Sequence, residues 1–97
     1  MGIAFEIVYL PPAIEEMQRL NRRLLLRIRR AIEERLGSHA DQAGQPLRAP
    51  LHGHRKLRVG DYRIIYRVTG RRVMILAVGN RRDVYQDFMR RLGLSPS

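Results

Sequence analysis

The segment that decides the fold is HRKLRVGDYRIIYRVTGRRVMILAVG, residues 54–79. It contains three runs rich in β-branched, aromatic and aliphatic residues, namely Arg55–Val59, Tyr62–Thr69 and Val73–Val78. Gly60-Asp61 and Gly70-Arg71 separate these runs, and two-residue loops with glycine are typical of tight β-hairpins. The segment therefore predicts three consecutive antiparallel strands.

Hairpin loop length also fixes the pairing register of the first two strands. With a two-residue loop, Val59 lies opposite Tyr62, Arg58 opposite Arg63 and Lys56 opposite Ile65. Because side chains alternate between the faces of a strand, the register sorts them into two groups. One face is apolar and predicted to be core: Leu57, Val59, Tyr62, Ile64, Tyr66 and Val68. The other face carries His54, Lys56, Arg58, Arg63 and Arg67.

The cationic face predicts an anionic ligand. Arg58 and Arg63 repel each other when they lie directly opposite, and a phosphate between them would remove that repulsion. A second two-residue loop pairs Arg63 with Val78, so that Arg81 and Tyr85 emerge beside Arg63. This geometry requires both loops to be two residues long, because a single bulge would rotate the residues beyond it.

The amino-terminal residues predict a strand and then a helix. Ala4–Leu10 is a short β-favouring run that stops at Pro11-Pro12, and Pro12 suits the first turn of a helix. The helix is indicated by apolar residues at helical spacing, Ile14, Met17 and Leu20, and it pauses at Asn21.

A second helix is predicted next, with an apolar residue at every fourth position: Leu24, Ile28, Ile32 and Leu36. Gly37 is expected to end it, since glycine is a common helix stop. The two helices should form a hairpin that covers the apolar face of the sheet.

The connection from Ser38 to Gly53 is long for a compact domain, and Leu47 and Leu51 are expected to hold it down. A last helix is predicted after the strands. Asp83 suits its N-cap position, Gly93 its end, and its apolar residues repeat at every fourth position: Val84, Phe88 and Leu92.

Length and composition indicate one domain, residues 1–97, of a cytoplasmic protein. Ninety-seven residues can bury one core but not two. The longest apolar run is too short to cross a membrane, so no membrane partner is expected. There is no cysteine, and the three histidines lie in a stretch rich in Pro, Gly and Ala. Neither a metal nor another cofactor is predicted.

The net charge of +10 predicts a polyanionic partner. The excess is concentrated in residues 46–82, which hold ten Lys or Arg and one acidic residue. All but one of the nineteen cations are arginine, which suits bidentate binding of phosphate.

A cationic cluster of this kind is suited to cleaving RNA without a metal. The 2′-hydroxyl attacks the neighbouring phosphorus, and arginines stabilise the charge that grows on the phosphate oxygens. Nearby cations would lower the pKa of Tyr85 and make it a base, or would position it for stacking on a nucleobase. His54 is a rival acid or base. The alternatives are that Tyr85 packs on the helices and that His54 has no chemical role.

Three stretches carry a resemblance to a known group: PLRAPLHG (46–53), HRKLRVGDYRIIYRV (54–68) and ILAVGNRRDVY (75–85). They resemble toxins of the RelE/ParE superfamily, particularly RelE-like mRNA interferases. The resemblance implies an α+β fold of order β-α-α-β-β-β(-α), with a helix hairpin on a small, four-stranded, mainly antiparallel sheet.

The same resemblance implies roles for individual residues. Lys56, Arg63 and Arg81 would contact the scissile phosphate, and Tyr85 would assist proton transfer or stacking. His54, Arg58 and Arg67 are expected to bind substrate because they lie on the same cationic face of the predicted hairpin. The implied reaction is cleavage of messenger RNA on the ribosome, leaving a 2′,3′-cyclic phosphate. His54 departs from the pattern, because well-studied members have a lysine there.

Two other functions remain open. ParE-type inhibitors of DNA gyrase share the GDYRIIYRV-like strand, and a non-catalytic nucleic-acid-binding module would also need a basic face. The joint presence of Lys56, Arg63, Arg81 and Tyr85 favours the ribonuclease.

An acidic, RelB-like antitoxin is the expected protein partner, and the resulting complex would bind operator DNA. By the predicted register, Met74, Leu76 and Val78 form an apolar stripe beside the cations, which suits an acidic amphipathic segment. Alternatively, the last helix folds back through Phe88 and Leu92 and covers this stripe.

Overall fold

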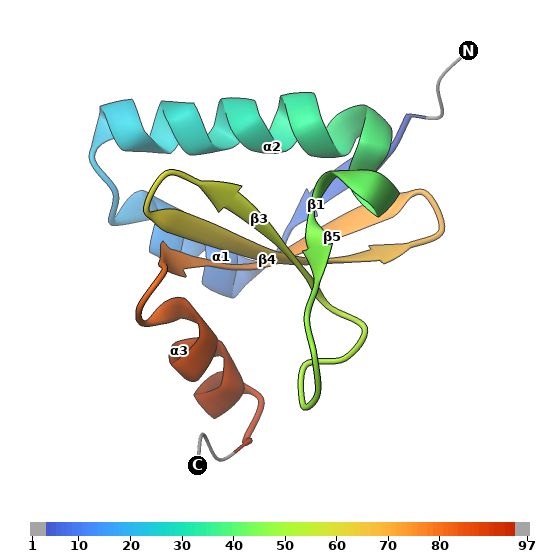
Figure 1. Cartoon of the computed structure of the whole chain (residues 1–97). Helices are drawn as coiled ribbons and strands as arrows, with labels where there is room; N and C mark the ends of the chain where they lie inside the picture. The colour runs from blue at the N-terminus through green and yellow to red at the C-terminus, as the bar shows by residue number, and fades with distance from the viewer. Residues whose placement is uncertain (1–3, 95–97) are drawn as a thin grey trace.

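The computed structural model describes residues 4–94 (Figure 1). The elements follow one another in the order β1 (Glu6–Tyr9), α1 (Pro11–Gln18), α2 (Arg22–Ala43), β2 (Gln45–Pro46), β3 (Arg55–Val59), β4 (Tyr62–Thr69), β5 (Arg72–Asn80) and α3 (Val84–Arg91). The α+β class and the predicted order of helices and main strands are therefore confirmed. Within the described residues, no helix is long and apolar enough to cross a membrane.

The sheet has five strands in the order β1-β5-β4-β3-β2, one more than predicted. The additional strand, β2, is only two residues long and pairs antiparallel with the start of β3. β1 runs parallel to β5, and the other pairs are antiparallel. α1 and α2 form the connection between β1 and β2, which lie at opposite edges of the sheet.

The predicted register of β3 and β4 is confirmed. Arg58 lies opposite Arg63, and Lys56 lies opposite Ile65. Gly60, at the turn, has a φ of 59°, which a glycine adopts without strain.

The predicted register of β4 and β5 is correct only near their shared turn, where Thr69 pairs with Arg72. Tyr66 pairs with Ile75 but Ile65 pairs with Ala77, so Leu76 is the extra residue of a β-bulge. Arg63 consequently lies opposite Gly79, and the predicted pairing with Val78 is wrong.

The bulge also corrects the predicted apolar stripe. An extra residue reverses the alternation of side chains beyond it. Met74 and Leu76 remain on the face away from α2, but Val78 turns into the main core, where it is 3% exposed. Val78 is therefore not part of a surface that an antitoxin could contact.

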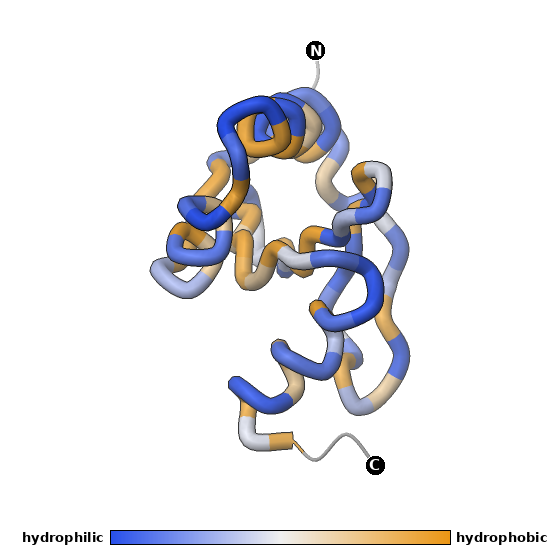
Figure 2. The backbone as a smooth tube through the Cα atoms, turned by 90° about the vertical axis from the view of Figure 1, so that its left-hand side faces the viewer, coloured by the Kyte–Doolittle hydropathy of each residue, from blue (hydrophilic) through white to orange (hydrophobic). Residues whose placement is uncertain are grey.

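α1 and α2 cover one face of the sheet, as predicted (Figures 1 and 2). Asn21 separates them, and its side-chain oxygen accepts a hydrogen bond of 2.9 Å from the backbone N–H of Leu24. The buried face of α2 consists of Ile28, Ile32, Leu36 and Ala40. These side chains pack on the apolar face of β3 and β4, so that this layer forms the main core.

α2 does not end at Gly37, as the sequence predicted, but continues to Ala43 with a kink at His39. Burial of Leu36 and Ala40 on the same helix face stabilises the additional turns. The helix ends at Gly44, where a Cβ would overlap the hydroxyl of Tyr66 and the backbone oxygen of Lys56. The end is therefore set by tertiary packing.

α3 lies on the opposite side of the sheet from α2 (Figures 1 and 2). A second, smaller core is formed beneath it. Val84 and Phe88 of this helix pack with Ile65, Ala77 and the loop residue Leu51. The predicted anchoring by Leu47 and Leu51 is confirmed, and α3 covers part of the predicted stripe through Phe88. Leu92 follows the helix and is 46% exposed.

Candidate functional site

The cationic face of the hairpin is present as predicted. Lys56 and Arg58 are two residues apart on β3 and share a face, and Arg63 lies opposite Arg58 on β4. Four ion pairs occur within residues 4–94, and their cations are Arg29, Arg72, Arg90 and Arg91. Within that range, no carboxylate pairs with Lys56, Arg58 or Arg63. These three residues form what we call the cationic cluster.

Arg63 is held by the hairpin turn. Its Nη1 donates hydrogen bonds of 2.9 Å to the backbone oxygens of Gly60 and Tyr62. These bonds orient the guanidinium and use few of its five donor hydrogens. Arg63 can therefore still bind an anion.

Arg81 lies next to the same turn, because its backbone N–H donates a 2.8 Å hydrogen bond to the oxygen of Asp61. Asn80 shapes the chain here: its side-chain oxygen accepts bonds of 3.0 Å from the N–H groups of Arg82 and Asp83. Asp83 occupies the predicted N-cap position of α3 without making a side-chain cap bond. The structure thus brings the backbone of Arg81 close to that of Arg63.

Tyr85, in the first turn of α3, completes the group. The Nζ of Lys56 lies 5.9 Å from the centre of its ring, within the range of a cation–π interaction. Gly79 permits this approach of α3, since a Cβ there would meet the Cβ of Val84 at 3.2 Å.

The environment of Tyr85 does not make it a phenolate. Partial burial raises the pKa of its hydroxyl above the ordinary tyrosine value, although the charge of Arg63 and a hydrogen bond from it act in the opposite direction. Arg63 does act to lower this pKa, as expected, but burial outweighs it and the net shift is upward. Tyr85 is a neutral phenol at physiological pH.

His54 and Arg67 are not gathered with the cationic cluster. His54 donates from Nδ1 to the backbone oxygen of Leu51 at 3.2 Å, and its ring packs edge-on against Phe88 with centroids 5.3 Å apart. Both His54 and Arg67 line a different, mainly apolar groove of about 320 Å³. These contacts favour a structural role for His54.

Sequence reasoning missed three residues around the cluster. Arg35, on α2, lines a cavity of about 290 Å³ together with Lys56, Arg58 and Arg63. Arg55 donates to the oxygen of Gly44 at 2.8 Å and to the hydroxyl of Tyr66 at 3.3 Å. Arg55 and Gly44 thereby hold the end of α2 against β3. The only sequence signal near these residues was Gly44-Gln45-Pro46, whose glycine and proline are typical of a turn after a helix.

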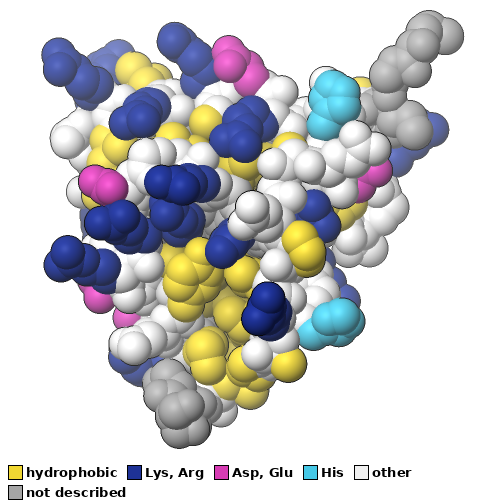
Figure 3. All heavy atoms as spheres, in the orientation of Figure 1, with side chains coloured by type: hydrophobic (Ala, Val, Ile, Leu, Met, Phe, Trp, Pro, Cys, Tyr) yellow, Lys and Arg dark blue, Asp and Glu magenta, His cyan; other side chains and the backbone are white. Residues whose placement is uncertain are grey.

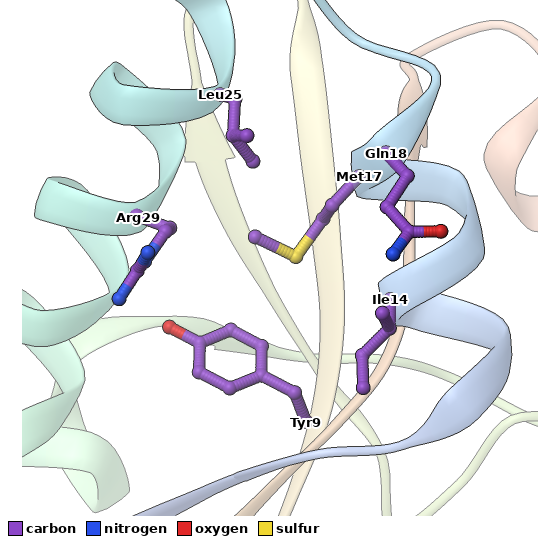
Figure 4. Close-up of a pocket in the computed structure, with 6 residues that line it drawn as sticks. All are labelled: Tyr9, Ile14, Met17, Gln18, Leu25 and Arg29. Atoms are coloured by element: carbon purple, nitrogen blue, oxygen red, sulfur yellow. The ribbon is translucent and has the colours of Figure 1, made fainter. Parts of the chain in front are cut away.

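Another cavity, of about 250 Å³, lies between α1 and α2 (Figure 4). Its lining is mainly apolar, and Tyr9 and Arg29 are its only ionisable residues. The hydroxyl of Tyr9 is buried and makes no hydrogen bond of good geometry within residues 4–94. Burial and the charge of Glu33 raise its pKa, and they outweigh the nearby Arg29, which acts in the opposite direction. Tyr9 and Arg29 alone do not form an acid–base pair or an anion site of several cations. The cavity also lies on the helix-covered side of the sheet, away from Tyr85.

Positive charge is also concentrated on the molecular surface near this site. Figure 3 shows Lys and Arg side chains gathered over α2 and the sheet below it, with few acidic side chains among them. A surface of this kind concentrates polyanions.

The fold is that of RelE and ParE toxins. A chain of the RelBE2 toxin-antitoxin complex of Mycobacterium tuberculosis superposes with a TM-score of 0.77 at 27% identity, covering 81% of this chain and 93% of that one. A free RelE mutant of Escherichia coli gives 0.73 at 20% identity, covering 92% and 98%. A chain of the ParDE system of Pseudomonas aeruginosa gives 0.60 at 19% identity, covering 81% and 98%.

Sequence comparison identifies the family. Residues 7–85 match the family described as the ParE toxin of the type II toxin-antitoxin system parDE. The chain therefore belongs to the ParE toxin family, and it is a type II toxin of the RelE/ParE superfamily. A search of curated protein sequences finds no match.

Proposed function

We propose that this toxin is an endoribonuclease that cleaves messenger RNA on the ribosome without a metal ion. The observation that carries the proposal is the grouping of Lys56, Arg63 and Tyr85, with the backbone of Arg81 fixed at the adjacent turn. This grouping contains several phosphate-binding donors and, within residues 4–94, no paired carboxylate. The choice of ribosome-bound message rests on the resemblance to RelE-like interferases.

In the proposed reaction the 2′-oxygen attacks the adjacent phosphorus and the 5′-oxygen leaves. The proton lost by the 2′-hydroxyl is gained, in the net reaction, by the 5′-oxygen, and a 2′,3′-cyclic phosphate remains. Arg63 and Arg81 bind the phosphate oxygens where negative charge develops, and Lys56 adds a positive charge beside them. Such donors stabilise the transition state more than the ground state, which is the requirement for catalysis.

Tyr85 acts in this proposal as a neutral platform. Because its pKa is raised, little phenolate is present at neutral pH, and Tyr85 is not proposed to act as a base. Its ring and its neutral hydroxyl contact the substrate instead. Stacking of the ring on a nucleobase would fix the nucleotide next to Lys56 and Arg63.

An acidic antitoxin is the proposed regulator, and it would contact Met74 and Leu76. These residues line the 320 Å³ groove between α1 and α3, and Arg67 and Arg91 lie among its lining residues. An acidic amphipathic segment suits an apolar groove with cations beside it. Operator binding by the resulting complex remains part of the proposal.

Inhibition of DNA gyrase is the second candidate, and the match to the ParE family favours it. A gyrase inhibitor needs no catalytic group, so the neutral Tyr85 fits this alternative as well.

One experiment separates the candidates. The purified protein is added to a translating mixture with a defined message, new 5′-ends are mapped, and gyrase supercoiling is assayed in parallel. The ribonuclease produces discrete new ends and leaves supercoiling unchanged. Loss of supercoiling without new ends would establish the gyrase alternative and refute the ribonuclease.

A further inference from the structure

The cavity lined by Arg35 opens at an uncovered stretch of sheet edge. β2 pairs only with Arg55 and Lys56, so the rest of β3 has no neighbouring strand on that side. The end of α2 and residues 43–45 stand beside this stretch and close the cavity of about 290 Å³. Arg35 enters it from α2, whereas Lys56, Arg58 and Arg63 enter from the sheet.

The lining of this cavity is strongly cationic. Four of its seven lining residues carry a positive charge, and the others are Ala43, Gly44 and Gln45. Ion pairs elsewhere in residues 4–94 show that this chain does place carboxylates beside arginines, as for Arg91 and Glu16 at 3.1 Å. Within residues 4–94 no carboxylate pairs with these four cations. They repel each other, and an anion in the space would relieve that repulsion.

Arg35 is held in place by backbone acceptors. Its Nη1 donates to the oxygen of Arg58 at 3.0 Å and its Nη2 to the oxygen of Ala43 at 3.5 Å. The segment it contacts is itself fixed, because Arg55 binds the oxygen of Gly44. These bonds leave further N–H donors on Arg35, and a guanidinium already oriented loses little entropy when it binds an oxyanion.

We propose that this cavity binds a second phosphate of the RNA strand, next to the scissile one, and that Arg35 is its specific ligand. The proposal rests on the proposed ribonuclease function, because Lys56 and Arg63 line both the cavity and the reaction site. Two adjacent phosphates held by one continuous group of cations would align the strand across the site. The planar fork of Arg35 matches the oxygens of a phosphate.

The test measures binding of 2′-deoxy oligonucleotides, which cannot be cleaved by the proposed chemistry. One ligand has a single phosphate between two nucleosides, and the other has several phosphates in a row. The variants are Arg35→Gln and, as a matched control on the outer face of the same helix, Arg30→Gln. Arg35→Lys tests whether charge alone suffices, and urea unfolding confirms that each variant is folded.

Arg35→Gln should weaken binding of the longer ligand about tenfold, as expected for loss of one charge-assisted hydrogen bond. Its affinity should depend less on salt, with the log–log slope shallower by about 0.7. Binding of the single-phosphate ligand should stay unchanged, and Arg35→Lys should recover part of the loss. Equal effects of Arg35→Gln and Arg30→Gln, or equal losses for both ligands, would overturn the proposal.

The outcome is separable from that of the proposed function. Weaker binding by folded Arg35→Gln in a protein that cleaves no message would retain the phosphate site and refute the ribonuclease. If the native protein cleaves message but Arg35→Gln does not change its affinity for the oligonucleotides, the ribonuclease function is retained and the second phosphate site is refuted. If Arg35→Gln weakened only the complex with an acidic antitoxin, the cavity would be a carboxylate site and the proposal would be wrong.

Discussion

At the scale of single residues, burial and charge oppose each other at Tyr85. The sequence showed the cations that would lower its pKa, but burial depends on how α3 packs and became visible only in the structure. The same limit applies to His54, because its aromatic partner Phe88 lies 34 residues further along the chain. The register read from the sequence predicted the shared face of Lys56, Arg58 and Arg63, whereas packing decides protonation and places His54 and Arg67 in a different groove.

The proposed role of Tyr85 predicts different results for two substitutions. Tyr85→Phe keeps the ring and should retain cleavage within about threefold, whereas Tyr85→Ala should lose about tenfold or more, the usual worth of a base stack. Because the pKa is raised, the phenol stays protonated below about pH 10, and the rate should not rise with phenolate formation between about pH 6 and 9. Single-turnover cleavage rates across this range measure both. A Tyr85→Phe variant as inactive as Tyr85→Ala would show that the hydroxyl is essential.

Tyr9 offers a stability prediction at the same scale. Within the described part of the chain its buried hydroxyl has no hydrogen-bond partner of good geometry, so Tyr9→Phe should stabilise the fold by about 1 kcal/mol at pH 7. Tyr66→Phe is the control: the hydroxyl of Tyr66 donates to the oxygen of Ala40 at 3.1 Å, and its loss should destabilise by about 1 kcal/mol. Urea unfolding of both variants measures the free energies.

The pH dependence of stability should also differ between Tyr9→Phe and the native chain. The pKa of Tyr9 is raised in the folded state, so the unfolded chain loses this proton first. The native chain should therefore lose stability as the pH rises above about 10, and Tyr9→Phe should lose less. Destabilisation by Tyr9→Phe at pH 7 would indicate that the hydroxyl does find a partner.

At the scale of elements, local turn signals predicted the β3–β4 hairpin in detail. Two-residue loops transmit register reliably along a hairpin, and the pairing of Arg58 with Arg63 followed from Gly60-Asp61 alone. The bulge at Leu76 has no comparable sequence signal. It moved Val78 into the core, so the sequence alone did not predict the extent of the proposed antitoxin surface.

The two glycines near the end of α2 give a matched pair of predictions. A Cβ at Gly44 would overlap Tyr66 and Lys56, so Gly44→Ala should destabilise the protein by about 1–3 kcal/mol. At Gly37, within the helix, a Cβ meets no heavy atom within 4 Å, and Gly37→Ala should stabilise by about 0.5–1 kcal/mol. Thermal and urea unfolding measure both. The opposite order of effects would contradict the position assigned to the end of α2.

At the scale of the whole molecule, two regions of different character lie at different places along the sheet. Cations gather at one end, around Lys56 and Arg63, and an apolar groove lies between α1 and α3. The concentration of positive charge was predicted from the sequence, because all but one of the charged residues in residues 46–82 are Lys or Arg. The groove could not be predicted from the sequence in this way, because it forms only when α3 packs across the sheet.

An antitoxin that occupies the groove should protect a defined set of backbone amides. Hydrogen exchange of the toxin, alone and in complex with an acidic partner co-expressed from an adjacent reading frame, should show new protection around Met74 and Leu76. Val78 should show little change, because it is already buried in the free toxin. A stable complex without added protection at residues 74–77 would place the antitoxin elsewhere.

In the proposed reaction, the cations around the β3–β4 turn stabilise the scissile phosphate. The most direct test is the initial rate of message cleavage on programmed ribosomes by the native chain, Arg81→Ala and Arg71→Ala. Arg71 is an exposed arginine in the β4–β5 turn, at the other end of the hairpin from Arg63, and serves as the control for charge. Arg81→Ala should cleave at least about a hundredfold more slowly, while Arg71→Ala stays near the native rate. A folded Arg81→Ala protein that cleaves at the native rate would contradict the account.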